Sequence, residues 1–142
     1  MGTSIYSSSL DKPLNFGVRV GSHDNYEIII FEGEYLNWKR NGEGKKYGGY
    51  IYEGNYLKGK KHGKGKQYYI NEDKQIVIIF KGEFYNGRKW NGFTYNNKGE
   101  KLCEFINGKS YGKEYDDQNE LMYEGEFLDW KYGGKGKKYN NK

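Results

Sequence analysis

The sequence predicts an all-β protein built as a meander of β-hairpins, and three observations support this prediction. The composition favours strands and turns over helices, because it holds 22 glycines and 16 tyrosines but only one proline and no alanine. A core of the type aromatic-Glu-Gly-Glu-aromatic recurs along the chain. Gly, Asn and Asp gather between the copies, where they favour tight turns.

The recurring core divides most of the chain into five units. They open with "FEGEY" at 31, "YEGNY" at 52, "FKGEF" at 80, the degenerate "KLCEF" at 101 and "YEGEF" at 123. The two most alike, "FEGEYLNWKRNGEGKKY" and "YEGEFLDWKYGGKGKKY", are identical at eleven of seventeen positions. A fixed period of this length is typical of repeat architectures, in which each copy is one structural unit.

The elements follow from the units in order. Residues 1–13 are expected to form a flexible tail, and residues 14–142 a repeat array. The array begins with a half repeat at 14–30, in which "GSHDN" separates two short strands. Each full unit then reads as a hairpin, and turn residues at 47–49, 71–74, 96–99 and 116–119 separate the units. The stretch "KQYYI", "NEDK", "QIVIIF" predicts one lengthened pair of strands.

Alternation along a strand assigns the residues of the core to two faces. In "YEGEF" the two rings and the glycine share one face and both glutamates share the other. A ring of a neighbouring strand is expected to cover the bare glycine. The glutamates are interpreted as a solvated ladder that pairs with lysines such as Lys45, Lys64 and Lys135, rather than as acid and base partners of a catalytic site.

This pattern resembles the MORN repeat, and the resemblance covers residues 16–142. The segment "YEGNYLKGKKHGKG" at 52–65 matches the family's unit almost throughout. Trp38 and Trp130 stand where the family has glycine, and a residue is inserted around Trp90. Lys101 replaces the first aromatic residue of the fourth unit and Cys103 its glycine, so that a local kink is expected there. The resemblance implies an elongated, twisted, single-layer antiparallel sheet.

The resemblance also implies a non-catalytic scaffold that binds a protein partner, as a peptide or a helix. A single layer leaves one face uncovered, so rings on it are expected to stay partly exposed and to form the partner-binding face. The rings can also simply pack along the sheet, and this structural role is compatible with partner binding. For the two tryptophans, capping a hairpin is the alternative and the preferred interpretation. The residues of this predicted face are Tyr35, Tyr56, Phe84, Phe105, Phe127, Trp38 and Trp130.

Two alternative functions follow from the turns and from the family. One is binding to an acidic phospholipid surface through basic residues that recur in one set of turns: Lys39, Arg40, Lys60, Lys61, Arg88 and Lys89, with Lys58 and Lys109 nearby. The other is a regulatory array of a larger enzyme, because family members occur as appendages on lipid kinases and methyltransferases. The sequence ends inside a turn, and the strand edge left open there offers a surface for a homodimer.

The sequence predicts neither an enzyme nor a cofactor or metal site. His23, His62 and Cys103 lie far apart. His62 occupies a turn position that other units fill with Asn41 or Asn91, which favours a structural role. The segment "GNYLKGKK" approaches a phosphate-binding loop but lacks the Ser or Thr and the following helix.

Charge and targeting signals limit the partners and the cellular locations that the sequence predicts. The net charge of +5 comes from 24 basic and 19 acidic residues that alternate along the chain, which does not predict a nucleic-acid partner. No secretory signal is visible, the longest apolar run is "IVIIF", and Cys103 has no second cysteine to pair with. We expect a cytoplasmic protein, associated with the cytoskeleton or with membranes as the family implies.

Overall fold

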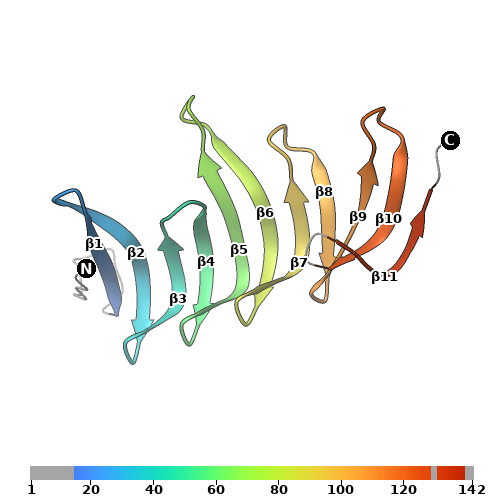
Figure 1. Cartoon of the computed structure of the whole chain (residues 1–142). Coiled ribbons are helices and arrows are strands. Elements are labelled where there is room, and N and C mark those ends of the chain that lie inside the picture. Colours follow the sequence, from blue (N-terminus) through green and yellow to red (C-terminus); the bar gives the residue numbers. More distant parts are fainter. Residues whose placement is uncertain (1–14, 129–130, 140–142) are drawn as a thin grey trace.

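The computed structural model describes residues 15–128 and 131–139, which form one open antiparallel sheet (Figure 1). Eleven strands lie in the sheet in the order of the sequence, and each pairs only with its neighbours along the chain. The predicted all-β meander of hairpins is therefore confirmed. Within the described residues the chain has no helix, so neither face of the sheet is covered by another layer.

The strands carry the repeated cores of the sequence at regular places. Units expected to begin near 31, 52, 80 and 123 begin inside β2, β4, β6 and β10, and residue 101 begins β8; the expected tail at 1–13 lies outside the described residues. The strands are β1 (Phe16–His23), β2 (Tyr26–Leu36), β3 (Lys39–Lys46), β4 (Ile51–Leu57), β5 (Lys60–Ile70), β6 (Ile76–Tyr85), β7 (Arg88–Tyr95), β8 (Lys101–Ile106), β9 (Lys109–Tyr115), β10 (Leu121–Leu128) and β11 (Lys131–Lys138).

The turns alternate between the two edges of the sheet. One edge carries the two-residue turns inside the units, which join β2 to β3, β4 to β5, β6 to β7 and β8 to β9. At Lys58 and Gly59 both turn residues have positive φ, 50° and 87°. This is the backbone of a type I′ turn, which matches the twist of antiparallel strands. The other edge carries the turns that connect one unit to the next.

Glycines in register form a row through the middle of the sheet. Successive strands β1–β7 pair through Gly17, Gly33, Gly44, Gly54, Gly65, Gly82 and Gly92. A Cβ atom added to Gly54 would lie 2.5 Å from the Cα atom of Gly65 and 2.7 Å from the hydroxyl of Tyr52. The glycines are therefore required because rings and neighbouring backbone approach them closely.

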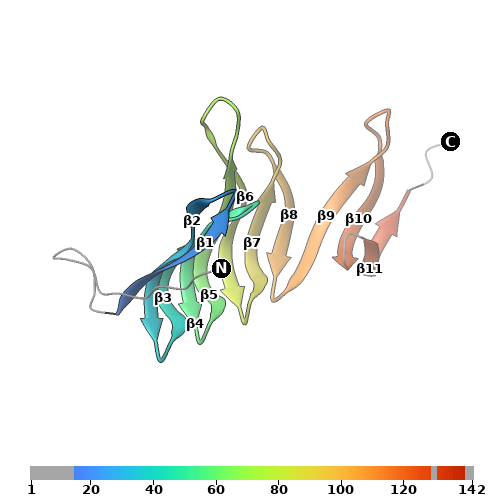
Figure 2. The same ribbon diagram turned by 60° about the vertical axis from the view of Figure 1, so that its left-hand side comes forward.

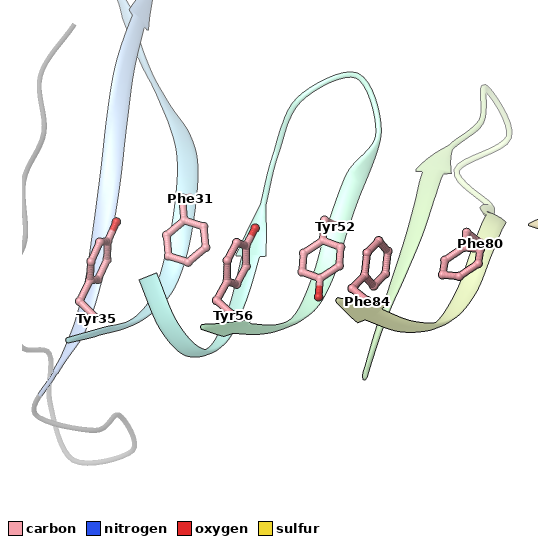
Figure 3. Packing of buried hydrophobic residues seen from close by; sticks show 6 residues of the cluster. All are labelled: Phe31, Tyr35, Tyr52, Tyr56, Phe80 and Phe84. Atoms are coloured by element: carbon pink, nitrogen blue, oxygen red, sulfur yellow. The ribbon is translucent and has the colours of Figure 1, made fainter. Parts of the chain in front are cut away.

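Aromatic rings pack over this glycine row in one continuous line (Figure 3). Each ring meets the next edge to face, with centroids 5.2 Å apart between Phe31 and Tyr56 and 5.0 Å apart between Tyr52 and Phe84. The line continues from Phe80 to Phe105 at 5.7 Å. Edge-to-face pairs each contribute about 0.5–1.5 kcal/mol beyond burial of their area. We call this side of the sheet the aromatic face.

The regular register ends at β8, as expected from the degenerate fourth unit. Gly92 pairs with Phe105, whereas Cys103 pairs with Gly112 on the other side of the same strand. The glycine row is thus displaced by two residues before it resumes. Strands β8 and β9 pair only next to their turn and then diverge, as Figure 2 shows.

Candidate functional site

A groove of about 920 Å³ crosses β1–β6 on the face opposite the aromatic rings, which we call the groove face. The backbone of the glycine row forms its floor, and charged side chains stand on both sides of the row. Its charged and amide lining residues are Glu32, Glu43, Lys45, Glu53, Asn55, Lys64, Lys66, Lys81 and Glu83.

One side of the groove is a row of charges that alternate in sign over the four strands β2–β5. Glu32, Lys45 and Glu53 are direct cross-strand partners, as are Glu53 and Lys66. The Lys66 Nζ atom lies 4.0 Å from the Glu53 Oε2 atom. The predicted glutamate and lysine ladder is therefore present at these positions, although exposed pairs of this kind contribute only about 0.2–1 kcal/mol each.

Tyrosine hydroxyls hold the glutamates of this row in place. Tyr47 donates a hydrogen bond to Glu32 at 2.6 Å, and Tyr68 donates one to Glu53 at 3.1 Å. Each tyrosine lies fifteen residues after its glutamate, which explains why the second segment of a unit ends in Tyr. These hydrogen bonds fix the position of the two carboxylates along the groove.

The rings that the sequence predicted for partner binding are mostly buried. Tyr35 is 8% exposed and Tyr56 and Phe84 are 4% exposed, while Phe105 and Phe127 are half-buried. The expectation of partial exposure is wrong for the first three, because each ring packs between its neighbours. The stems of long basic residues also contribute to the cover on this face.

Basic side chains lie directly over the aromatic row. The guanidinium of Arg40 lies 4.3 Å from the Phe31 ring centroid, and the Lys61 Nζ atom lies 4.9 Å from that of Tyr52. Lys89 lies 5.4 Å from the ring centroid of Phe80. Burial lowers the pKa of Lys61, with the neighbouring cations adding to the effect, and burial lowers the pKa of Lys89. These three residues therefore stabilise the sheet through cation–π contacts.

The residues predicted to contact lipid all lie at the edge of the two-residue turns, but on different faces. Arg40, Lys61 and Lys89 belong to the aromatic face, whereas Lys39, Lys60 and Arg88 are exposed on the groove face. In β3 and β5 three residues face one residue of the neighbouring strand, and these two extra residues leave the alternation of faces unchanged. Each set therefore takes one face because its members are adjacent in sequence to those of the other set, and sequence reasoning did not separate them because it left the face of the second strands open.

Charge is strongly divided between the two edges of the sheet. The segments 36–40, 57–61, 85–89 and 106–110, which hold the four described two-residue turns, contain eight basic residues and no acidic one. The turns of the other edge, within 23–26, 47–50, 71–75, 96–100 and 116–120, contain seven acidic residues and two lysines. We call these the basic edge and the acidic edge.

Trp38 is the predicted contact residue with the most exposed side chain, at 81%. It has φ of 66° at the second position of its turn, where the other described turns of the basic edge have Gly59, Gly87 and Gly108. Such an exposed ring contributes little as a packing cap for its hairpin. The corresponding Trp130 lies outside the described residues.

His62 has the structural role that its turn position predicted. Its Nδ1 atom accepts a hydrogen bond at 3.2 Å from the backbone N–H of Asn86, the first turn residue of the next unit. Asn41 accepts from Lys58 and Asn91 accepts from Asn107 in the same way, both at 3.0 Å. These bonds connect each turn of the basic edge to the next.

Groups that would indicate chemistry are few in the described residues. Residues 15–128 and 131–139 contain no cluster of three His, Cys, Asp or Glu side chains placed to hold a metal ion. The same part of the chain has no helix of the length and apolarity needed to cross a membrane. Burial raises the pKa of the Cys103 thiol, which disfavours the reactive thiolate.

No protein-family model matches the sequence, and no curated protein matches it either.

Proposed function

We propose that the protein is a non-catalytic scaffold of the MORN type, and that it binds a segment of a protein partner on its groove face. The groove carries this proposal, because it is the long concave surface of the described sheet and its floor and charges are fixed by the chain itself. The repeat motif supports the class of protein. The buried rings argue for the groove face rather than the aromatic face as the surface that meets the partner.

The character of the groove favours a protein partner. Charges of both signs lie along it, so a polyanion such as a nucleic acid would meet Glu32 and Glu53 as well as the lysines. A polypeptide can supply complementary groups of both signs. The ring row on the opposite face keeps the sheet rigid, which lowers the entropic cost of binding.

Filling the groove tests the proposal. Asn55 lines the groove and faces away from the rings, so Asn55→Trp would place an indole in the path of the partner. The matched control is Asn97→Trp in an exposed turn of the acidic edge. We expect the unmodified chain and the control to retain the same proteins from an extract of the cells that produce it, and Asn55→Trp to lose them. Equal retention by all three would contradict binding in the groove.

The division of charge supports a second candidate, the binding of the basic edge to an acidic phospholipid surface. Eight basic residues without an acidic neighbour in the same segments would attract an anionic bilayer, and the attraction would weaken with salt. Sedimentation with vesicles that contain phosphatidylserine tests it. Binding that disappears when Lys58 and Lys60 are changed to Glu supports this candidate, and no binding at physiological salt refutes it.

A further inference from the structure

We infer that the partner segment is an acidic amphipathic helix that lies across the hairpins at the basic edge of the groove face. The inference rests on the proposed function and names the class of partner. It comes from a row of residues that the glycine and aromatic pattern does not require.

The row consists of the residue pairs that close the four two-residue turns. In each pair an exposed apolar side chain on one strand is the direct partner of an exposed basic side chain on the next: Leu36 with Lys39, Leu57 with Lys60, Tyr85 with Arg88 and Ile106 with Lys109. The apolar members are 56%, 44%, 52% and 44% exposed. We call these eight residues the strip.

All eight residues belong to the groove face. Leu36 follows Glu34 and Glu32 at alternate positions of β2, and Leu57 follows Asn55 and Glu53 in β4. The intervening Tyr35 and Tyr56 are buried on the aromatic face, which confirms the alternation. The strip therefore lies along one side of the groove and is open to solvent.

The strip alternates apolar and basic residues over the eight strands β2–β9. Neighbouring strands are about 4.8 Å apart, so residues of one kind recur about every 9.6 Å. Along one side of an α-helix, positions three or four residues apart are separated by about 5 Å and positions seven apart by about 10.5 Å. A helix with an apolar residue at every seventh position and an acidic residue midway between them would match the strip residue by residue.

The shape of the edge also fits a rod. The four described turns of the basic edge lie along a nearly straight line in the views of both Figure 1 and Figure 2. Eight strands span about 34 Å, which corresponds to a helix of about 22 residues. A straight row of this length is what a continuous helix needs, because its side chains must reach every hairpin.

Charge and the position of the apolar residues distinguish the helix from a membrane. No acidic residue occurs in the strip or in its turns, so its charge favours an anionic ligand. A bilayer that touched the edge would meet the turn tips. In the four described turns these tips carry Lys58, Asn86 and Asn107, with Trp38 as the single apolar residue. The other exposed apolar side chains lie behind the tips on the groove face, where a rod can reach them and a flat surface cannot.

A synthetic helix provides the direct test. The probe is a peptide of about 22 residues with Leu at every seventh position, Glu midway between, and helix-favouring polar residues elsewhere. Fluorescence anisotropy measures its affinity for the full chain. We expect saturable binding, loss of binding when the Glu residues are replaced by Lys, and loss when the same residues are scrambled to remove the period.

Substitutions in the strip locate the binding. Leu57→Ser with Lys60→Glu changes two exposed side chains and is expected to weaken probe binding about tenfold or more. The control Ile70→Ser with Lys98→Glu makes the same two changes at exposed positions near the acidic edge, at the end of β5 and in the turn before β8, and should leave the affinity unchanged. Circular dichroism of both variants shows whether the sheet is intact. If the double variant unfolds, the single variant Lys60→Glu replaces it in the binding measurement.

Each remaining result overturns the inference. Binding of the scrambled peptide to the same extent would show attraction by charge alone, and binding unaffected by the strip variant would place the helix elsewhere. Strip-dependent binding to anionic vesicles without probe binding would identify a membrane ligand. If the probe fails while Asn55→Trp still abolishes retention of a cellular protein, the helix is refuted and the proposed function stands. If probe binding does not depend on the strip and protein retention does not depend on Asn55, the inference and the proposed function are both refuted.

Discussion

Replacing Trp38 by glycine should stabilise the protein, although it removes a large and exposed ring at the basic edge. Trp38 has φ of 66°, and left-handed backbone costs about 1–2 kcal/mol for a residue with a side chain. Glycine avoids this cost but loses about 0.5–1 kcal/mol through its greater freedom in the unfolded chain. Because the side chain is 81% exposed, little burial is lost. The expected net gain in free energy of unfolding is about 0.5–1 kcal/mol.

Urea denaturation followed by circular dichroism measures this gain. For an m-value of about 2 kcal/mol/M, the midpoint of Trp38→Gly should rise by about 0.4 M. Asn86→Gly is the matched control, because Asn tolerates its φ of 54° and the midpoint should change little. A lower midpoint for Trp38→Gly would refute the strained turn and would mean that the indole stabilises the sheet. A confirmed gain would favour a functional reason for the tryptophan.

Three further predictions concern the sheet itself. Phe80→Ala should lower the free energy of unfolding by about 3–5 kcal/mol, because the ring is 0% exposed and contacts both Phe84 and Phe105; a urea midpoint close to the unmodified one would contradict the ring row. His62→Asn should keep stability within about 0.5 kcal/mol while His62→Ala costs about 1 kcal/mol, and equal effects would exclude the hydrogen bond to Asn86. Burial raises the pKa of Tyr52 above 10.0, so the unfolded chain loses that proton first and stability falls as pH rises through about 10. The free energy of unfolding should fall less between about pH 9 and about pH 11 for Tyr52→Phe than for the unmodified chain. An equal fall would contradict the assignment of this pH dependence to Tyr52.

The meander was predictable from sequence because its signals are local. A glycine between two rings fixes the face of each residue, and two-residue turns such as Lys58-Gly59 set the register of each hairpin. The irregular fourth unit was also visible, since Lys101 and Cys103 depart from the pattern. The two-residue displacement of the glycine row was not predicted, because it depends on pairing between units rather than within one.

The candidate site was predicted less well than the fold. The sequence assigned Tyr35, Tyr56 and Phe84 to an exposed face, but edge-to-face packing and overlying cations bury them. Lys60 and Lys61 lie on opposite faces as neighbours in a strand, but the sequence alone did not decide which of them shares the face of the rings. The strip was also missed, because it emerges only when the closing pairs of successive hairpins are placed side by side.

Site-specific photo-crosslinking tests most directly whether the groove face binds the partner. A photoreactive phenylalanine analogue at Asn55 would lie in the groove, whereas at Lys46 it would lie on the aromatic face, because Lys46 pairs with Phe31 and Tyr52. The account predicts a crosslinked adduct of one defined mass from position 55 in an extract of the producing cells, and none from position 46. An adduct from position 46 alone would place the partner on the rings and would contradict the account.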